Sequence, residues 1–160
     1  MNWRKWLEKW EMKSLKIKAP FLEMTWEPSD ADKAAAWELY IELLTRISTQ
    51  HLAPTHGDEE TALKSIYSLF DLTREVIKRH GRDCTEFAKL AVVILNQVVR
   101  PFTAEWHKRS LAGEFKDEAS CAKFRQDLSE VQRVLRIYTQ MLGDMVGLEE
   151  EERLTELEEV

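Results

Sequence analysis

One hundred and sixty residues are enough for one domain with a buried core, and 44% hydrophobic with 32% charged residues exclude a disordered or collagen-like chain. Residues 1–18 contain six basic and two acidic side chains, whereas residues 149–160 contain seven glutamates and one arginine. The excess of positive charge is therefore confined to the N-terminus, whereas most DNA-binding domains have a basic body, so that general DNA binding is disfavoured. Two cysteines and no apolar run longer than 90–95 favour a cytoplasmic protein without a disulfide framework, secretory leader or membrane span.

The N-terminal segment, residues 1–28, is rich in tryptophan. Three tryptophans between positions 3 and 10 recur at the spacing of one face of an amphipathic helix. Residues 15–17 and 22–26, separated by a proline, alternate between apolar and polar side chains, which predicts two short β-strands. Because two strands alone are marginal in water, we expect them to lie on helices or to pair with another chain.

Residues 29–147 have helical periodicity and predict a mainly α domain, a bundle of four to five helices, before an acidic C-terminal tail at 148–160. Ser29 and Asp32 have the spacing of a capping box at the start of a helix over 31–50. The apolar face expected for this helix consists of Trp37, Tyr40, Ile41, Leu44 and Ile47.

Two further helices are expected after the loop HLAPTHG. Asp58 is placed to cap a helix that ends at Gly81, and Asp83 with Glu86 is placed to cap the next. This next helix is apolar on nearly every side at 90–95, which is typical of a helix at the centre of a bundle.

The last part of the domain is expected to contain two helices. Pro101 should break the central helix and leave a short one to about residue 111. The longest helix should begin after Asp117 and end at Gly147.

The N-terminal segment is the candidate partner-binding surface. Trp3, Trp6 and Trp10 together form an apolar patch of the order of a few hundred Å², about the largest that monomers expose. Leu15 and Ile17 lie on the adjacent predicted strand, whose edge is unpaired. We expect this surface to bind a protein partner, to form a homodimer, or to fold onto the chain's own bundle. A membrane is disfavoured because two glutamates dilute the positive charge of the helix.

No cluster of residues predicts a metal or a cofactor. The nearest ligand pairs are His51 with His56 and His80 with Cys84. The first pair is five residues apart across a loop that contains a proline, and the second is four apart but is interrupted by Gly81, where the helix is expected to end, so that neither pair is expected on one helix face. Cys84 falls in the first turn of a helix, where the dipole would lower the pKa of its thiol, but no histidine is specified as its partner. We expect both cysteines to be buried as small residues.

Arg100 and His107, in RPFTAEWH, are seven residues apart and would share one face of a continuous helix. An arginine followed by a histidine at such a distance resembles the motif of HEPN-type ribonucleases, helical bundles that cut RNA without a metal. The imidazole would take the 2′-OH proton and the guanidinium would stabilise the phosphorane. Pro101 departs from that family's polar residue and should push Arg100 out of helical geometry, so that Arg100 instead bonds to helix C-terminal carbonyls.

Residues 37–50, 56–81 and 96–107 are also similar to a group of small uncharacterised bacterial helical proteins that accompany defence- or conflict-type operons. The resemblance implies a cytoplasmic accessory protein and transfers no catalytic residue. Our primary interpretation is a non-enzymatic protein-interaction module, an adaptor or regulatory subunit without cofactor or DNA. RNA is a substrate only if Arg100 and His107 form a ribonuclease site.

Overall fold

A computed structural model describes residues 1–46 and 58–154 of the chain. Within these ranges the protein is mainly α-helical and contains no β-strand, only an isolated antiparallel bridge between Asn2 and Thr25. The α-helices are α1 (Trp3–Lys9), α2 (Asp30–Leu44), α3 (Glu59–Tyr67), α4 (Leu69–His80), α5 (Thr85–Ile94), α6 (Arg100–Leu111) and α7 (Glu118–Val146). The loop at 51–57, with its two histidines, and the last part of the acidic tail lie outside the described residues.

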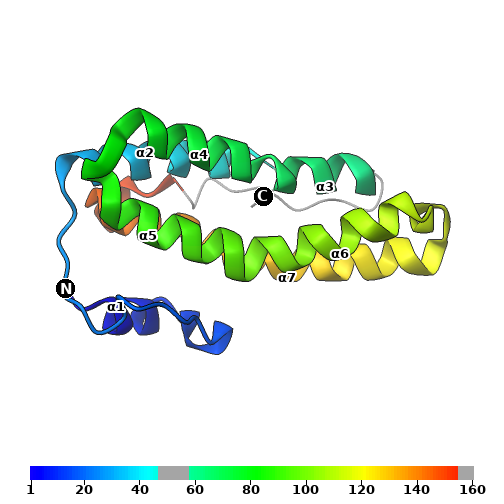
Figure 1. The fold of residues 1–160 in the computed structure, drawn as a ribbon, viewed down its shortest axis with the longest axis horizontal. Helices are drawn as coiled ribbons and strands as arrows, with labels where there is room; N and C mark the ends of the chain where they lie inside the picture. The colour runs from blue at the N-terminus through cyan, green and yellow to red at the C-terminus, as the bar shows by residue number, and fades with distance from the viewer. Residues whose placement is uncertain (47–57, 155–160) are drawn as a thin grey trace.

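The helices from α2 to α7 pack side by side into an elongated bundle (Figure 1). Helices α3 and α4 follow one edge, and the chain reverses at the 3-10 turn η2 (Gly81–Cys84), so that α5 and α6 return beside them. The longest helix, α7, packs against α2 and α6, and α2 also contacts α4 and α5. The hydrophobic core lies between these helices.

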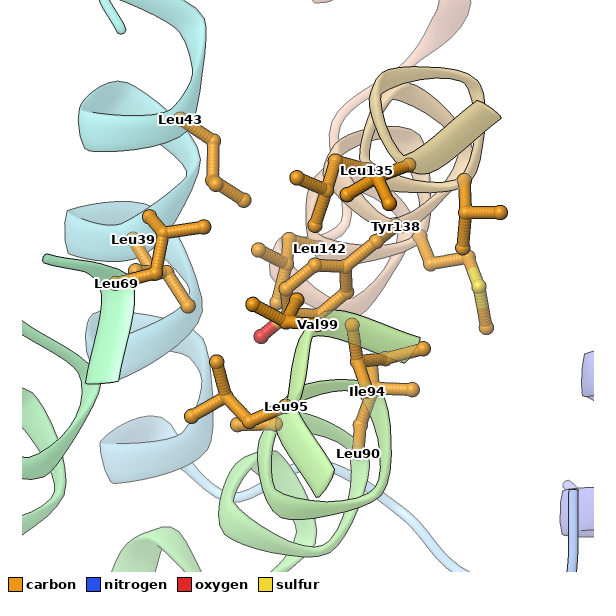
Figure 2. Packing of buried hydrophobic residues seen from close by; sticks show 14 of the residues in the cluster. Leu39, Leu43, Leu69, Leu90, Ile94, Leu95, Val99, Leu135, Tyr138 and Leu142 are labelled. Carbon is orange, nitrogen blue, oxygen red and sulfur yellow. The ribbon is translucent and has the colours of Figure 1, made fainter. Parts of the chain in front are cut away.

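Figure 2 shows the centre of this core, where side chains from α2, α4, α5 and α7 meet. Leu39 and Leu43 come from α2, Leu90 and Ile94 from α5, and Leu142 from α7. The predicted inward face of α2 is confirmed at Tyr40, which is buried, and Ile41 and Leu44 are half-buried against the core, while Ile47 lies outside the described residues. Trp37, which was expected inside, is 42% exposed.

The predicted strands are wrong because the chain turns where the alternating pattern would require it to stay extended. Met12–Leu15 forms a 3-10 turn, η1, and Lys16 has a left-handed backbone with φ 51°. Residues 20–23 form a second turn. The alternation instead reflects a chain that lies on the protein, with Leu22 and Trp26 buried and Met24 exposed.

Most predicted helix ends are confirmed. The capping box at Ser29 and the side-chain caps at Asp58 and Asp117 are present. Gly81 and Gly147 follow α4 and α7 with φ of 71° and 92°, a region that glycine occupies without steric penalty.

Pro101 does not break the helix, contrary to the prediction. Residues 95–99 form a π-helical turn, η3, in which the amide of Arg100 donates to the carbonyl of Leu95, and α6 continues directly from it. A π turn is wider than an α turn, and it comes where the proline ring would otherwise clash with the carbonyl of Gln97. Arg100 consequently keeps helical angles, with φ −60° and ψ −46°.

One helical stretch, Glu59–Leu111, contains a window that is long and apolar enough to cross a membrane by length and composition. Half of that window is buried inside the protein. The core helix of a protein without a membrane span also meets the criteria of length and apolar composition. Residues 90–95, the most apolar run of this stretch, lie mostly in the hydrophobic core.

Candidate functional site

The predicted partner-binding residues at the N-terminus lie against the rest of the protein. Trp3 is 0% and Trp6 is 2% exposed, and Trp10, Leu15 and Ile17 are half-buried against the hydrophobic core. The expected exposed tryptophan patch is therefore wrong. Of the arrangements considered from sequence, the structure shows the helix folded onto the chain's own bundle. Partner binding by these residues stays a prediction.

The tryptophans form an aromatic cluster with the returning chain. The rings of Trp3 and Trp26 stack with centroids 4.4 Å apart, and Trp6 meets Trp26 edge-on at 4.8 Å. Phe21 packs on the other side of Trp3, at 4.9 Å. Buried aromatic pairs of this kind add about 0.5–1.5 kcal/mol beyond their area. The cluster therefore stabilises the folded N-terminal segment from within.

Two side chains of the bundle fasten this segment. The carboxylate of Asp144, near the end of α7, accepts hydrogen bonds from the indole N–H groups of Trp6 (2.6 Å) and Trp10 (3.2 Å). The carboxamide of Gln97, in η3, accepts from the amide of Lys18 at 3.1 Å and donates to its carbonyl at 2.8 Å. Neither contact was predicted from the sequence, because each joins positions about 80 or more residues apart.

The second predicted pair, Arg100 and His107, lies on α6 beside a pocket. This pocket, of about 120 Å³, opens between α3 and α6, and we call it the α3–α6 groove. Its lining residues are Glu60, Leu63, Lys64, Tyr67, Thr103, His107, Ser110 and Leu111. Tyr67 is 59% and Leu111 is 80% exposed, so large apolar surfaces remain in water at its rim.

Planar groups line the seam between α6 and the α3–α4 rod. The guanidinium of Arg100 lies 4.6 Å from the centre of the Phe70 ring, and Phe70 packs on Tyr67 at 5.7 Å. Tyr67 in turn stacks on the imidazole of His107, with centroids 6.4 Å apart. The sequence spacing placed Arg100 and His107 on one helix face correctly, but it did not indicate the two aromatic residues that contact them.

Arg100 and His107 do not converge on one point within the chain. The guanidinium turns back by one helical turn, where its Nε and Nη2 both donate to Oδ1 of Asn96, at 3.2 and 3.1 Å. His107 lies seven residues further on, a rise of about 10 Å along the helix. One phosphate therefore cannot lie between the two groups in this arrangement. The alternative contacts predicted for Arg100, with helix C-terminal carbonyls, are replaced by this bond to Asn96.

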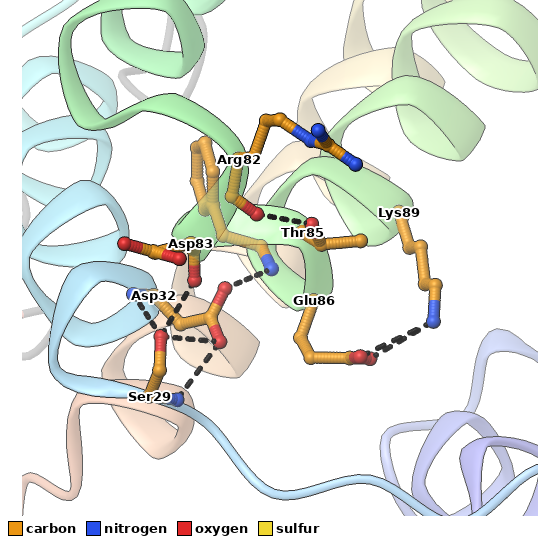
Figure 3. Close-up of polar contacts among 8 residues, drawn as sticks. Ser29, Asp32, Arg82, Asp83, Thr85, Glu86 and Lys89 are labelled. Atoms are coloured by element: carbon orange, nitrogen blue, oxygen red, sulfur yellow. Dashed lines mark hydrogen bonds and ion pairs between the residues drawn. The ribbon is translucent and has the colours of Figure 1, made fainter.

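A buried carboxylate joins the start of two helices at the opposite end of the bundle. Asp32 is 1% exposed, and Figure 3 shows its oxygens facing Ser29, whose amide donates to Oδ2 at 2.8 Å. Its Oδ1 accepts the amide hydrogen of Phe87, in the first turn of α5, at 2.9 Å. The predicted cap of α5 by Asp83 and Glu86 is wrong, because no side chain of its own segment caps that helix.

The cysteines are not candidate nucleophiles. Burial, and next the negative charge of Asp32, raise the pKa of the Cys84 thiol, contrary to the lowering expected from the helix dipole. Burial also raises the pKa of Cys121, which is half-buried. Across residues 1–46 and 58–154, no three histidine, cysteine or acidic side chains lie together in a way that could hold a metal ion. The imidazole of His80 contacts Glu38 at 2.9 Å, while Cys84 donates to the carbonyl of Gly81.

Comparisons with known proteins add no relative: no protein-family model, no curated protein and no solved structure matches the chain.

Proposed function

We propose that this protein is a non-enzymatic interaction module, an adaptor or regulatory subunit, and that it binds a protein partner through the α3–α6 groove. The observation that carries the proposal is the exposure of Tyr67 and Leu111 on either side of one pocket. Single exposed apolar side chains are ordinary, but two large ones at the rim of a pocket form the kind of surface that protein partners cover.

The groove replaces the tryptophan-rich segment as the proposed contact surface. Trp3 and Trp6 are only 0% and 2% exposed, whereas the groove is open among residues 1–46 and 58–154. The floor of the pocket contains Leu63 and Thr103, which are buried and belong to two helices packed against each other. A rigid floor with an apolar rim favours binding because little side-chain freedom is lost on association.

The proposal is tested with one substitution at the rim and one away from it. Leu111→Ser removes the most exposed large apolar side chain of the groove, which is 80% exposed. Val92→Ser removes another exposed apolar side chain, which is 46% exposed and lies on α5, away from the groove. The parent protein and the two variants, each carrying the same tag, are used to capture partners from the native cell extract. Quantitative mass spectrometry compares the captured proteins. We expect a protein captured by the parent and by Val92→Ser to be lost with Leu111→Ser. Equal capture by all three proteins would contradict the proposal.

A ribonuclease that uses Arg100 and His107 is the second candidate. Both side chains are exposed on one face of α6, and Arg100 has helical geometry in spite of Pro101. Because the two groups do not converge in one chain, this activity would need Arg100 to leave Asn96 or a second copy to complete the site. Incubation with RNA in EDTA, beside His107→Ala, separates the candidates. Cleavage that is lost in the variant would replace the first proposal with the second.

The accessory role in a bacterial defence system and the cytoplasmic location remain proposals that rest on the sequence alone. Self-association also remains a proposal, and light scattering on the whole chain tests it directly. The structure lowers the expectation that tryptophans form a dimer contact, since Asp144 and the aromatic cluster already cover two of them.

A further inference from the structure

Arg100 carries a positive charge that is held in place but not neutralised. Its Nε and Nη2 are fixed by Asn96, and its face lies on the ring of Phe70. No carboxylate in the described part of the chain lies within ion-pair distance of it. A guanidinium has five N–H donors, and the bonds to Asn96 leave the edge between Nη1 and Nη2 open.

This state is unusual for an arginine of this protein, which has a net charge of −6. Most other arginines of the described ranges have an acidic partner. The ion pairs are Arg4–Glu23, Arg46–Glu42, Arg74–Asp71, Arg79–Glu38, Arg109–Glu114, Arg125–Glu59 and Arg133–Glu130. A guanidinium held by its neighbours, with an open edge, is preorganised to bind a carboxylate through two parallel hydrogen bonds.

The distance from Arg100 to the pocket sets the spacing between the carboxylate and the apolar group of a ligand that contacts both. On α6, the pocket is centred near His107, seven residues or about 10 Å from Arg100. On a partner helix that lies along the groove, two side chains on the same face are separated by this distance when they are seven residues apart.

We propose that the α3–α6 groove takes an amphipathic helix of the partner that carries a carboxylate seven residues from an apolar side chain. The carboxylate binds the open edge of Arg100, and the apolar side chain enters the pocket between Tyr67 and Leu111. This inference rests on the proposed function and adds to it the chemistry of the partner. It follows from charge complementarity at Arg100, which lies on α6 about 10 Å from the centre of the groove, and from apolar exposure at the rim of the groove.

The test uses synthetic peptides and the whole chain labelled with ¹⁵N. The probes are helix-stabilised, alanine-based peptides with one leucine and one glutamate seven residues apart, made in both orders, and matched peptides with glutamine in place of glutamate. Binding is followed at millimolar peptide through the Nε–H resonance of Arg100 and the backbone resonances of α6. We expect a glutamate peptide in one order to bind at least threefold more tightly than its glutamine counterpart.

Two variants assign this difference to the guanidinium. Arg100→Gln should bind both peptides equally, whereas Arg74→Gln, which alters an exposed arginine paired with Asp71, should keep the preference for glutamate. Equal binding of glutamate and glutamine peptides by the parent, or no binding in either order, would overturn the inference. Neither result decides the proposed function, which the capture experiment with Leu111→Ser judges separately.

Discussion

Removing the carboxylate of Asp32 should destabilise the protein far more than its position beside an exposed serine suggests. The carboxylate satisfies two backbone amides at once, that of Ser29 before α2 and that of Phe87 in α5. In Asp32→Ala the amide of Phe87 loses its partner at a buried position, which costs about 2 kcal/mol. Loss of the capping box adds about 1 kcal/mol. We therefore expect a decrease of about 3 kcal/mol in the free energy of unfolding.

Urea unfolding, followed by circular dichroism at 222 nm and by tryptophan fluorescence, measures this decrease. With a slope of about 2 kcal/mol per molar urea, typical of a small domain, the midpoint should fall by about 1.5 M. Asp83→Ala is the matched control, because Asp83 is exposed, is close in the structure and was the cap expected from sequence. Its carboxylate caps no helix in the structure, so its midpoint should move by less than about 0.25 M.

Equal midpoints for the two variants would refute the reasoning, and so would a larger loss in Asp83→Ala. Hydrogen exchange locates the effect independently. In Asp32→Ala, the first turn of α5 should exchange faster than the middle of α7, because only the former loses a hydrogen-bond partner.

Three further predictions concern single side chains. Tyr138→Phe should leave the free energy of unfolding unchanged or raise it by up to about 1 kcal/mol, because the Tyr138 hydroxyl is buried without a hydrogen bond; a urea midpoint lowered by about 1 M would contradict this. Burial also raises the pKa of Tyr138, so that in the native protein it should contribute to the tyrosinate absorbance only at a higher pH than an ordinary tyrosine does. With a thiol reagent at pH 8, Cys121 should react before Cys84, because Cys84 is fully buried and burial raises the pKa of its thiol. Mass spectrometry gives the order of modification, and the opposite order would be inconsistent with the packing. Asp144→Ala should leave the indole N–H of Trp6 without a hydrogen-bond partner and lower the free energy of unfolding by about 1–3 kcal/mol. Hydrogen exchange in residues 1–28 should become faster, and unchanged exchange there would show that Asp144 does not hold this segment on the bundle.

Local rules predicted the elements whose determinants lie within a few residues of one another. The capping box at Ser29 and the cap at Asp117 need only a side chain and an amide three residues away, and both are present. The stop at Gly147 needs only a left-handed backbone. Such features can be predicted because neighbours in the sequence are neighbours in space.

Contacts between distant positions were not predictable in the same way. The helix α5 lacks a local cap because Asp32, 55 residues earlier, takes that role. On α2, Tyr40 was assigned to the inward face correctly and Trp37 was not. This helix is apolar on several sides, so that only packing against α7 and α4 decides that Leu39 turns inwards and Trp37 outwards. For the candidate site, the spacing of Arg100 and His107 gave the correct helix face. The pocket, and the stacking on Phe70 and Tyr67, depend on how α3 lies beside α6.

The π turn at 95–99 makes the groove sensitive to the geometry of this part of the chain. An α-helix rotates by about 100° per residue, and a π turn contains one residue more per hydrogen-bonded ring. Deleting one residue here and restoring α geometry would leave α6 close to its present orientation. A change to α geometry with no residue deleted would instead turn α6 by about 100° relative to α5. Arg100 would then leave Phe70, and His107 would leave Tyr67, although every side chain of α6 was still present. The face of α6 that lines the groove therefore depends on the geometry of this turn as well as on the residues that α6 contains.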